Sequence, residues 1–237
     1  MEIKVRKIFE KAQALLEQKG AQSLEEAQRM MNAIKVESRE VREALAYFAS
    51  YWHDLARPAL LSLACEAVGG SPAIDFGTAT VLTGGAISIY DDIIDRSKVK
   101  RSRPTVLGKF GNDIALLTAT ALLFESFTHL CGLLKKLETS KVNAILKLFK
   151  NLFYELGDAE ALEINFRGRV DVTPKEYLHM VRKKAGDVEA QMRIGALLGS
   201  ASELEMEALA QYGRSLGMMM ILRDDLADLL DEKELLH

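Results

Sequence analysis

The chain has little cysteine and no long uncharged apolar run, and each shortage argues against a class of protein. Two cysteines, Cys65 and Cys131, are too few and too isolated for a disulfide framework or a zinc site. The apolar stretch 114–124 is shorter than the roughly 18 residues of a membrane span, and Glu125 ends it. The charged start of the chain lacks the apolar core of a signal peptide. We therefore expect a soluble cytoplasmic protein without a membrane span.

The sequence also has no excess of basic charge, only four prolines and no evident strand-forming pattern. The net charge of -3 gives no general attraction to nucleic acid. The four prolines each lie near a plausible helix start or loop, and between them apolar residues recur at three- and four-residue spacing. No strand, hairpin, linker or short repeat is evident. The sequence predicts an all-α fold of roughly ten helices, with residues 1–237 as one domain in which 1–42 form N-terminal helices.

Several helix limits follow from local signals. Gly20 is expected to end a first helix that starts at Ile3, and Ser23 to open a second one. The segment Thr173-Pro174-Lys175-Glu176 is a typical helix start, with threonine as the cap and proline in the first turn. The other expected helices are 38–48, Pro58 to Gly69-Gly70, 75–95, 112–133, 141–166 and 203–231.

Two aspartate clusters of the same form stand far apart in these helices. They are Asp91-Asp92-Ile93-Ile94-Asp95 and Asp224-Asp225-Leu226-Ala227-Asp228. In a helix the first and fifth residues share nearly one face, so each cluster aims two or three carboxylates at one small volume. If the two helices face each other, about six carboxylates converge, and hard divalent cations would relieve their repulsion. Because Mg2+ prefers a few carboxylates with waters and phosphates, the pattern indicates a metal–diphosphate site.

Basic residues near these clusters add information about the substrate. Lysine and arginine side chains are the usual partners of phosphate oxygens. As an ensemble they favour a diphosphate ester, although a surface ion pair is the ordinary role of any single one. The candidates are Arg57, Lys100, Arg101, Arg103, Lys183, Lys184 and Arg223.

These motifs, in this order, resemble those of the trans-type (E-type) isoprenyl diphosphate synthases, the polyprenyl synthetase family. The similarity runs from about residue 43 to the end of the chain. Besides the two aspartate motifs it includes Arg57-Pro58, Leu63 to Ala67, Lys100-Arg101, Pro104-Thr105, Gly111-Asn112-Asp113, Tyr177 to Met180, Lys184 before Gly186, and Leu216-Gly217.

The resemblance implies a helical bundle of the class I isoprenoid synthase type with a central cavity, acting as a homodimeric prenyltransferase. Asp91, Asp95 and Asp224 would be the main ligands of three Mg2+ ions, supported by Asp92, Asp225 and Asp228. Lys100 and Lys184 would bind the allylic diphosphate, and Arg57 and Arg101 would face isopentenyl diphosphate. Asp91, Asp95, Asp224 and Lys184 would carry the catalytic step, which joins the two substrates into a longer prenyl diphosphate.

The sequence departs from the family pattern in the half of the site assigned to isopentenyl diphosphate. Asp54 replaces the lysine of the usual Gly-Gly-Lys-x-x-Arg-Pro block, Ile221 replaces a glutamine, and Ala185 replaces a threonine. The chain also ends at His237, shortly after the second motif. Upstream of the first motif Gly84, Gly85 and Ala86 are small, which favours a product of C20 or longer.

Three other readings stay open. An enzyme of the same fold that ionises an allylic diphosphate without condensation, such as a terpene cyclase, would explain the loss of the lysine at position 54. A non-catalytic subunit would also retain the acidic clusters. A di-iron bundle needs two Glu-x-x-His motifs, and only Glu176 to His179 fits.

Overall fold

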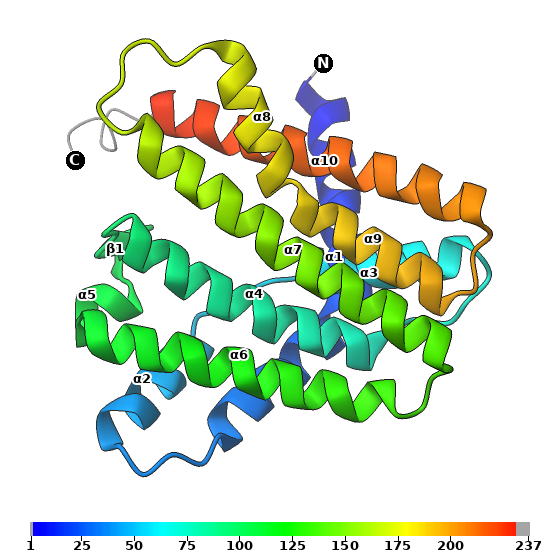
Figure 1. The fold of residues 1–237 in the computed structure, drawn as a ribbon, viewed down its shortest axis with the longest axis horizontal. Coiled ribbons are helices and arrows are strands. Elements are labelled where there is room, and N and C mark those ends of the chain that lie inside the picture. The colour runs from blue at the N-terminus through cyan, green and yellow to red at the C-terminus, as the bar shows by residue number, and fades with distance from the viewer. Residues whose placement is uncertain (1, 231–237) are drawn as a thin grey trace. The chain divides into compact units, whose positions relative to one another are not determined.

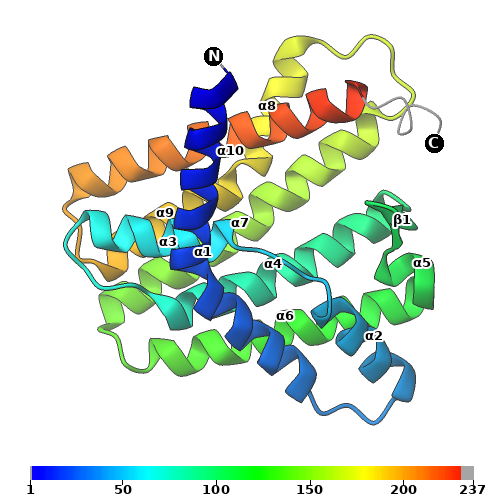
Figure 2. The ribbon, with the colours of Figure 1, turned by 180° about the vertical axis from the view of Figure 1, so that it is seen from behind.

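The computed structural model describes residues 2–230, apart from the side chains of residues 2–5, 228 and 230. Within that part of the chain there are ten α-helices and one two-stranded sheet, which confirms the all-α prediction (Figures 1 and 2). The residues fall into two compact units, 1–63 with 72–137 and 64–71 with 138–237. The single domain and its central cavity stay predictions.

The first unit contains most of the N-terminal half of the chain. Its helices α4 and α6 pack side by side, and α1 packs against α4 (Figure 1). The elements are α1 (Glu2–Ala33), α2 (Arg39–Ala49), the start of α3 (Ala56–Ala67), α4 (Ile74–Ile94), β1 (Val99–Lys100), β2 (Arg103–Pro104), α5 (Val106–Phe110) and α6 (Asn112–Leu134).

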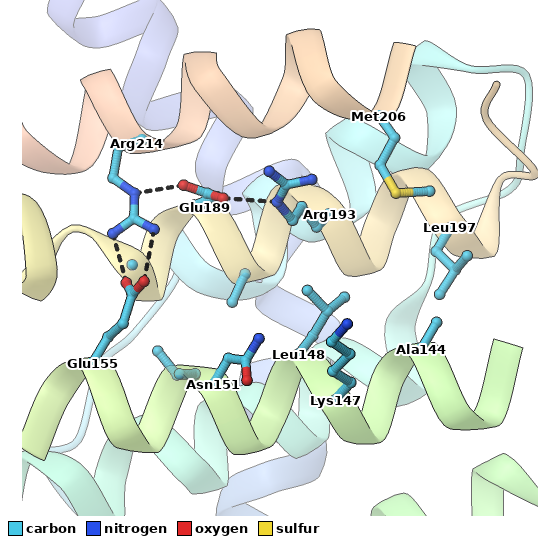
Figure 3. A pocket seen from close by; sticks show the side chains of 13 residues that line it. Ala144, Lys147, Leu148, Asn151, Glu155, Glu189, Arg193, Leu197, Met206 and Arg214 are labelled. Atoms are coloured by element: carbon cyan, nitrogen blue, oxygen red, sulfur yellow. Dashed lines mark hydrogen bonds and ion pairs between the residues drawn. The ribbon is translucent and has the colours of Figure 1, made fainter. Parts of the chain in front are cut away.

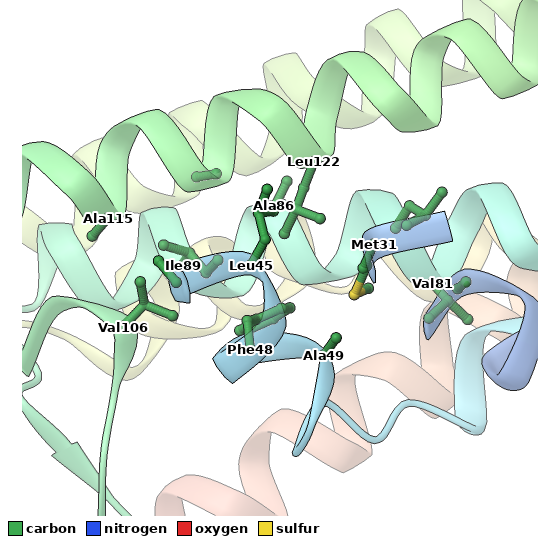
Figure 4. Close-up of a cluster of buried hydrophobic side chains, with 14 of the residues drawn as sticks. Met31, Leu45, Phe48, Ala49, Val81, Ala86, Ile89, Val106, Ala115 and Leu122 are labelled. Carbon is green, nitrogen blue, oxygen red and sulfur yellow. The ribbon is translucent and has the colours of Figure 1, made fainter. Parts of the chain in front are cut away.

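A hydrophobic core joins four helices of this unit (Figure 4). Met31 of α1, Phe48 of α2, Ile89 of α4 and Leu122 of α6 are each at most 1% exposed. Burying a side chain of this size stabilises a fold by roughly 1.5–3 kcal/mol. The core therefore holds α4, which carries the first aspartate motif, against helices from three other parts of the sequence.

The first helix does not end at Gly20 as predicted. It continues to Ala33, and the glycine is required for packing, since a Cβ at Gly20 would lie 2.6 Å from the Leu55 carbonyl oxygen. Ser23 is likewise no helix start. Its hydroxyl is fully buried and donates to the carbonyl of Ile74 at 2.8 Å. Both residues mark contacts between segments rather than helix boundaries.

The absence of a hairpin was also predicted wrongly. β1 and β2 form a short antiparallel pair in which Lys100 is opposite Arg103. Arg101 and Ser102 occupy the two turn positions with φ of 50° and 60°. Two-residue hairpin turns favour asparagine and glycine at such positions, so this turn carries no sequence signal.

The second unit consists mainly of the C-terminal helices. They are α7 (Thr139–Phe166), α8 (Pro174–Lys184), α9 (Gly186–Leu198) and α10 (Glu203–Leu230). Helix α9 packs against α7 and α10, and α8 contacts the same two helices. The predicted start of α8 is confirmed, because Thr173 and Glu176 form a reciprocal capping box. This box defines the position of the first turn of α8.

Helix α6 bears on the prediction that no segment spans a membrane. By length and composition it is the one helix of residues 2–230 that qualifies for a span, and 33% of its apolar window is buried. Its buried face packs against α4. Leu116, Leu117, Phe124 and Phe127 are exposed on the other face. The absence of a span stays a prediction.

Candidate functional site

The first aspartate motif lies at the C-terminal end of α4. Asp91 and Asp92 are in the last turn, and Asp95 is the C-cap, whose backbone N–H donates to the carbonyl of Asp91 at 2.9 Å. The C-terminal end of a helix already carries a partial negative charge. Three carboxylates at this end therefore create a strong local demand for cations.

Lys100 meets part of this demand. Its ammonium nitrogen lies 2.9 Å from Asp91 Oδ2 and 2.8 Å from Asp92 Oδ1. Burial raises the pKa of Asp92 above its ordinary value, and Lys100 partly offsets this. Although burial lowers the pKa of Lys100, the two aspartates raise it more, so the ammonium stays charged. Lys100 therefore lies beside the first motif, and its role towards the allylic diphosphate stays a prediction.

The hairpin that carries Lys100 is anchored to helix α2 and to the turn that follows it. The hydroxyl of Tyr47 donates to the Pro104 carbonyl at 2.7 Å, and the Arg103 guanidinium lies 3.6 Å from the centre of the Tyr51 ring. Arg103 is thus engaged in a cation–π contact. Arg101 lies exposed in the turn of the hairpin. Its predicted role towards isopentenyl diphosphate stays a prediction.

Arg57, at the start of α3, is held by an acidic neighbour. Its Nη1 lies 2.8 Å from Oδ2 of Asp54, whose side chain is only 5% exposed. The other oxygen of Asp54 accepts the backbone N–H of Arg57 at 3.2 Å. The Arg57 side chain also packs on Gly84, where a Cβ would lie 3.1 Å from it. Gly84 precedes Asp91 by two helical turns, about 10 Å along the same face of α4.

The second aspartate motif lies near the end of α10, in the other unit. Asp224 is exposed and accepts from Nε of the adjacent Arg223 at 2.8 Å. Asp225 is half-buried and accepts a hydrogen bond from the hydroxyl of Tyr177 on α8. Burial raises the pKa of Tyr177, and Asp225 raises it further, so the phenol acts as the donor. The side chain of Asp228 lies outside the described residues.

Lys184, at the end of α8, is bound by two acids of α7. Its ammonium nitrogen lies 3.1 Å from Oε1 of Glu160 and in closer contact with Glu163. Burial lowers the pKa of Lys184, but the two glutamates raise it more, so the side chain remains a cation. Lys183 likewise pairs with an acid of α7, and its ammonium nitrogen lies 2.8 Å from Oδ2 of Asp158.

The sequence did not predict that Glu160 and Glu163 contact Lys184, or that Tyr177 contacts Asp225. The two glutamates are three residues apart and so share a helix face, which is a weak signal on its own. Their significance appears only when α7 packs against α8. No group of three His, Cys, Asp or Glu side chains is gathered as a metal site among the residues described. The metal-ligand roles given to the aspartates stay predictions.

The second unit also contains a cavity of about 390 Å³ between α7, α9 and α10 (Figure 3). Arg214 of α10 lies on its wall and binds Glu155 of α7 at 2.7 Å and Glu189 of α9 at 2.5 Å. Arg193 extends the network by pairing with Glu189 at 2.7 Å. The charged side chains of this wall mostly form ion pairs with one another, which indicates that the network stabilises the fold.

Comparison with known proteins gives evidence on the origin of this chain that does not depend on the geometry of the site. The model of the polyprenyl synthetase family matches residues 38–237. A geranylgeranyl diphosphate synthase of Methanosarcina mazei is 34% identical over 202 residues, which are 83% of this chain and 61% of the relative. A (2E,6E)-farnesyl diphosphate synthase of Mycobacterium tuberculosis is 35% identical over 182 residues, which are 76% of this chain and 50% of that enzyme.

The fold has solved counterparts as well. The crystal structure of geranylgeranyl pyrophosphate synthetase from Pyrococcus horikoshii superimposes with a TM-score of 0.83 and 27% identity, and the match covers 96% of this chain and 69% of that one. The described helices therefore adopt the fold of these synthases. The matched region spans between half and two thirds of the length of the two curated relatives named above.

Proposed function

This chain belongs to the polyprenyl synthetase family, and on that premise we propose that it is an Mg2+-dependent prenyltransferase. It condenses an allylic prenyl diphosphate with isopentenyl diphosphate to give a longer prenyl diphosphate. The observation that carries the proposal is the cluster at the end of α4, where Lys100 bridges Asp91 and Asp92. A helix C-terminus with three carboxylates and a lysine suits metal ions and a diphosphate together.

The donor set fits Mg2+. Hard carboxylate oxygens are available from Asp91, Asp92 and Asp95 in one unit and from Asp224 and Asp225 in the other. Mg2+ usually takes only one or two carboxylates and completes its shell with waters and substrate phosphates, so a preassembled ligand cluster is not needed. When bound, the ions supply charge stabilisation to the departing diphosphate. We propose three ions, with Asp228 as a further ligand.

The chain's own cations hold the substrate in this proposal. Lys100 and Lys184 bind the allylic diphosphate, and each is kept charged by the acids beside it. The allylic C–O bond breaks, and the double bond of isopentenyl diphosphate attacks the resulting cation. A new C–C bond forms, and a proton passes to the released pyrophosphate. The products are one longer prenyl diphosphate and pyrophosphate, which carries the transferred proton.

Product length is proposed as C20 or longer, in keeping with the geranylgeranyl diphosphate synthase among the relatives. The small residues upstream of the first motif have a packing role besides. A Cβ at Gly84 would press on Arg57, and one at Gly85 would lie 2.9 Å from the Phe48 ring. Their small size is therefore required by these neighbours, and the length proposal rests on the relative instead.

A second candidate function is favoured by one specific contact. Asp54 already neutralises Arg57, the residue assigned to isopentenyl diphosphate. A site with less positive charge suits an acceptor without a diphosphate. An enzyme that ionises the allylic diphosphate and uses another acceptor, or closes a ring, is the alternative.

A product assay separates these functions. Purified protein with Mg2+ receives geranyl, farnesyl or geranylgeranyl diphosphate, each with and without isotopically labelled isopentenyl diphosphate, and products are read by mass spectrometry. We expect the label in a longer prenyl diphosphate, whose mass gives the chain length. Pyrophosphate release with an unlabelled alcohol or hydrocarbon would support the alternative. No turnover in any mixture would contradict both.

We also propose a homodimer formed through the exposed apolar face of α6. Phe124 and Leu117 on this face are 66% and 53% exposed. Apolar side chains gathered on one face commonly mark an interface. Light scattering should give twice the 26.3 kDa mass of the chain, and Phe124→Glu should give the single mass. Leu204→Glu, at a residue of α10 that is 85% exposed, is the control and should leave the dimer intact.

Light scattering together with a vesicle co-sedimentation assay can contradict the dimer proposal. If wild-type protein runs as a monomer but co-sediments with phospholipid vesicles, and Phe124→Glu abolishes the sedimentation, the face of α6 binds membrane. Because α6 is long and apolar enough to enter a bilayer, this outcome has a physical basis.

A further inference from the structure

Tyr177 of α8 connects the helix that carries Lys184 with the second aspartate motif on α10. Its hydroxyl donates a hydrogen bond to Oδ2 of Asp225, and so joins α8 to the aspartate motif of α10. Lys184 lies seven residues further along α8, two turns away on nearly the same face. One helix thus carries both the partner of an aspartate-motif carboxylate and a cation proposed to bind diphosphate.

The tyrosine is held in place from both sides. Its side chain packs against an apolar cluster whose buried members include Met180 and Val181 of α8. The residue directly before it, Glu176, belongs to the capping box and accepts from the hydroxyl of Thr173 at 2.7 Å. A side chain fixed at its ring and at its backbone presents its hydroxyl in one direction.

A fixed donor restricts the carboxylate that accepts from it. Asp224, next to Asp225, is exposed and pairs with its sequence neighbour Arg223. Asp225 is half-buried, and its Oδ2 is bound by a partner from a different helix. The hydrogen bond engages Oδ2 and thereby fixes the orientation of the carboxylate, including its other oxygen, Oδ1. Such outer partners orient a carboxylate and adjust its affinity for a metal ion.

We propose that Tyr177 is a positioning residue that orients the Asp225 carboxylate for a divalent cation bound together with a diphosphate. This role rests on the proposed function. The tyrosine touches neither the reacting atoms nor the cation, and it acts through Asp225. Loss of an outer-shell partner of this kind typically lowers metal affinity or activity by about 10- to 100-fold.

The test is the variant Tyr177→Phe, which removes only the hydroxyl and keeps the ring in its apolar cluster. The readout is binding of Mn2+, as a probe for Mg2+, in the presence of inorganic pyrophosphate, followed by electron paramagnetic resonance. We expect the dissociation constant for Mn2+ to rise at least about tenfold. The melting temperature, measured by circular dichroism, should stay close to that of the wild type.

The matched control is Tyr212→Phe on α10, at a residue that is 61% exposed. It should leave Mn2+ binding unchanged. If Tyr177→Phe binds Mn2+ as the wild type does, the positioning role is overturned while the proposed activity stands. If wild-type protein binds Mn2+ and pyrophosphate but does not lengthen the prenyl diphosphate, the proposed activity fails while the role of Tyr177 stands. Wild-type protein that binds no Mn2+ would overturn both.

Discussion

Replacing Asp91 by alanine is expected to lower turnover of the allylic diphosphate by about a thousandfold, and Asp224→Ala should have a similar effect. Removing one group that stabilises charge in a transition state commonly lowers the rate by roughly 10²–10³-fold. A lost carboxylate ligand weakens both metal binding and placement of the diphosphate. Initial rates of pyrophosphate release at saturating Mg2+ measure the effect directly.

Matched controls are available on the same two helices. Asp75 is exposed in the first turn of α4, about 24 Å along the helix from Asp91, and Glu203 is exposed at the start of α10. Alanine at either control position should change the rate less than twofold. Near-wild-type turnover in both Asp91→Ala and Asp224→Ala would show that the aspartate motifs do not form the active site.

The second large effect concerns stability rather than chemistry. Arg214→Ala should lower the free energy of unfolding by about 3 kcal/mol, since removing one partner of a buried ion pair leaves uncompensated charge behind. The Arg214 side chain is 14% exposed, and those of its partners Glu189 and Glu155 are 15% and 36% exposed. Its Nη1 also donates to the carbonyl of Arg182 at 2.7 Å, so the substitution loosens contacts among all four helices of the second unit.

Thermal unfolding followed by circular dichroism measures this prediction. For a chain of this length, 3 kcal/mol corresponds to a fall in melting temperature of roughly 6–12 °C. Arg39→Ala is the comparison, because Arg39 is 80% exposed and pairs with Glu43 one turn away. Such a surface pair contributes little to stability, because solvent screens its charges. Equal melting temperatures for the two variants would mean that the Arg214 network does not stabilise the unit.

Helix type and most helix limits could be predicted because their signals are local. The three- and four-residue apolar spacing indicates helices whatever their partners, and Thr173 with Glu176 satisfies backbone groups within one turn. Errors arose where a residue serves a distant contact. Gly20 and Ser23 resemble residues that end and begin helices. Instead, Gly20 permits the close approach of Leu55, and Ser23 donates a hydrogen bond to Ile74.

The candidate site divides in the same way. Each aspartate motif can be recognised in the sequence because its residues lie within five positions of one another. Lys100 can be recognised because it follows the first motif closely. The hairpin that delivers Lys100 was missed, since Arg101 and Ser102 are unusual residues for a turn with positive φ. Asp54 was recognised as a charge reversal, but its ion pair with Arg57 is a property of the folded chain.

By itself the sequence determined the all-α class, the family and the identity of the acidic motifs, because residue type and spacing along a helix carry that information. Only the tertiary structure decided which charges meet. Lys184 lies against Glu160 and Glu163, and Asp225 against Tyr177, through packing of α8 with α7 and α10. Such pairings join residues 21 to 48 positions apart, and no helical period relates positions on different helices.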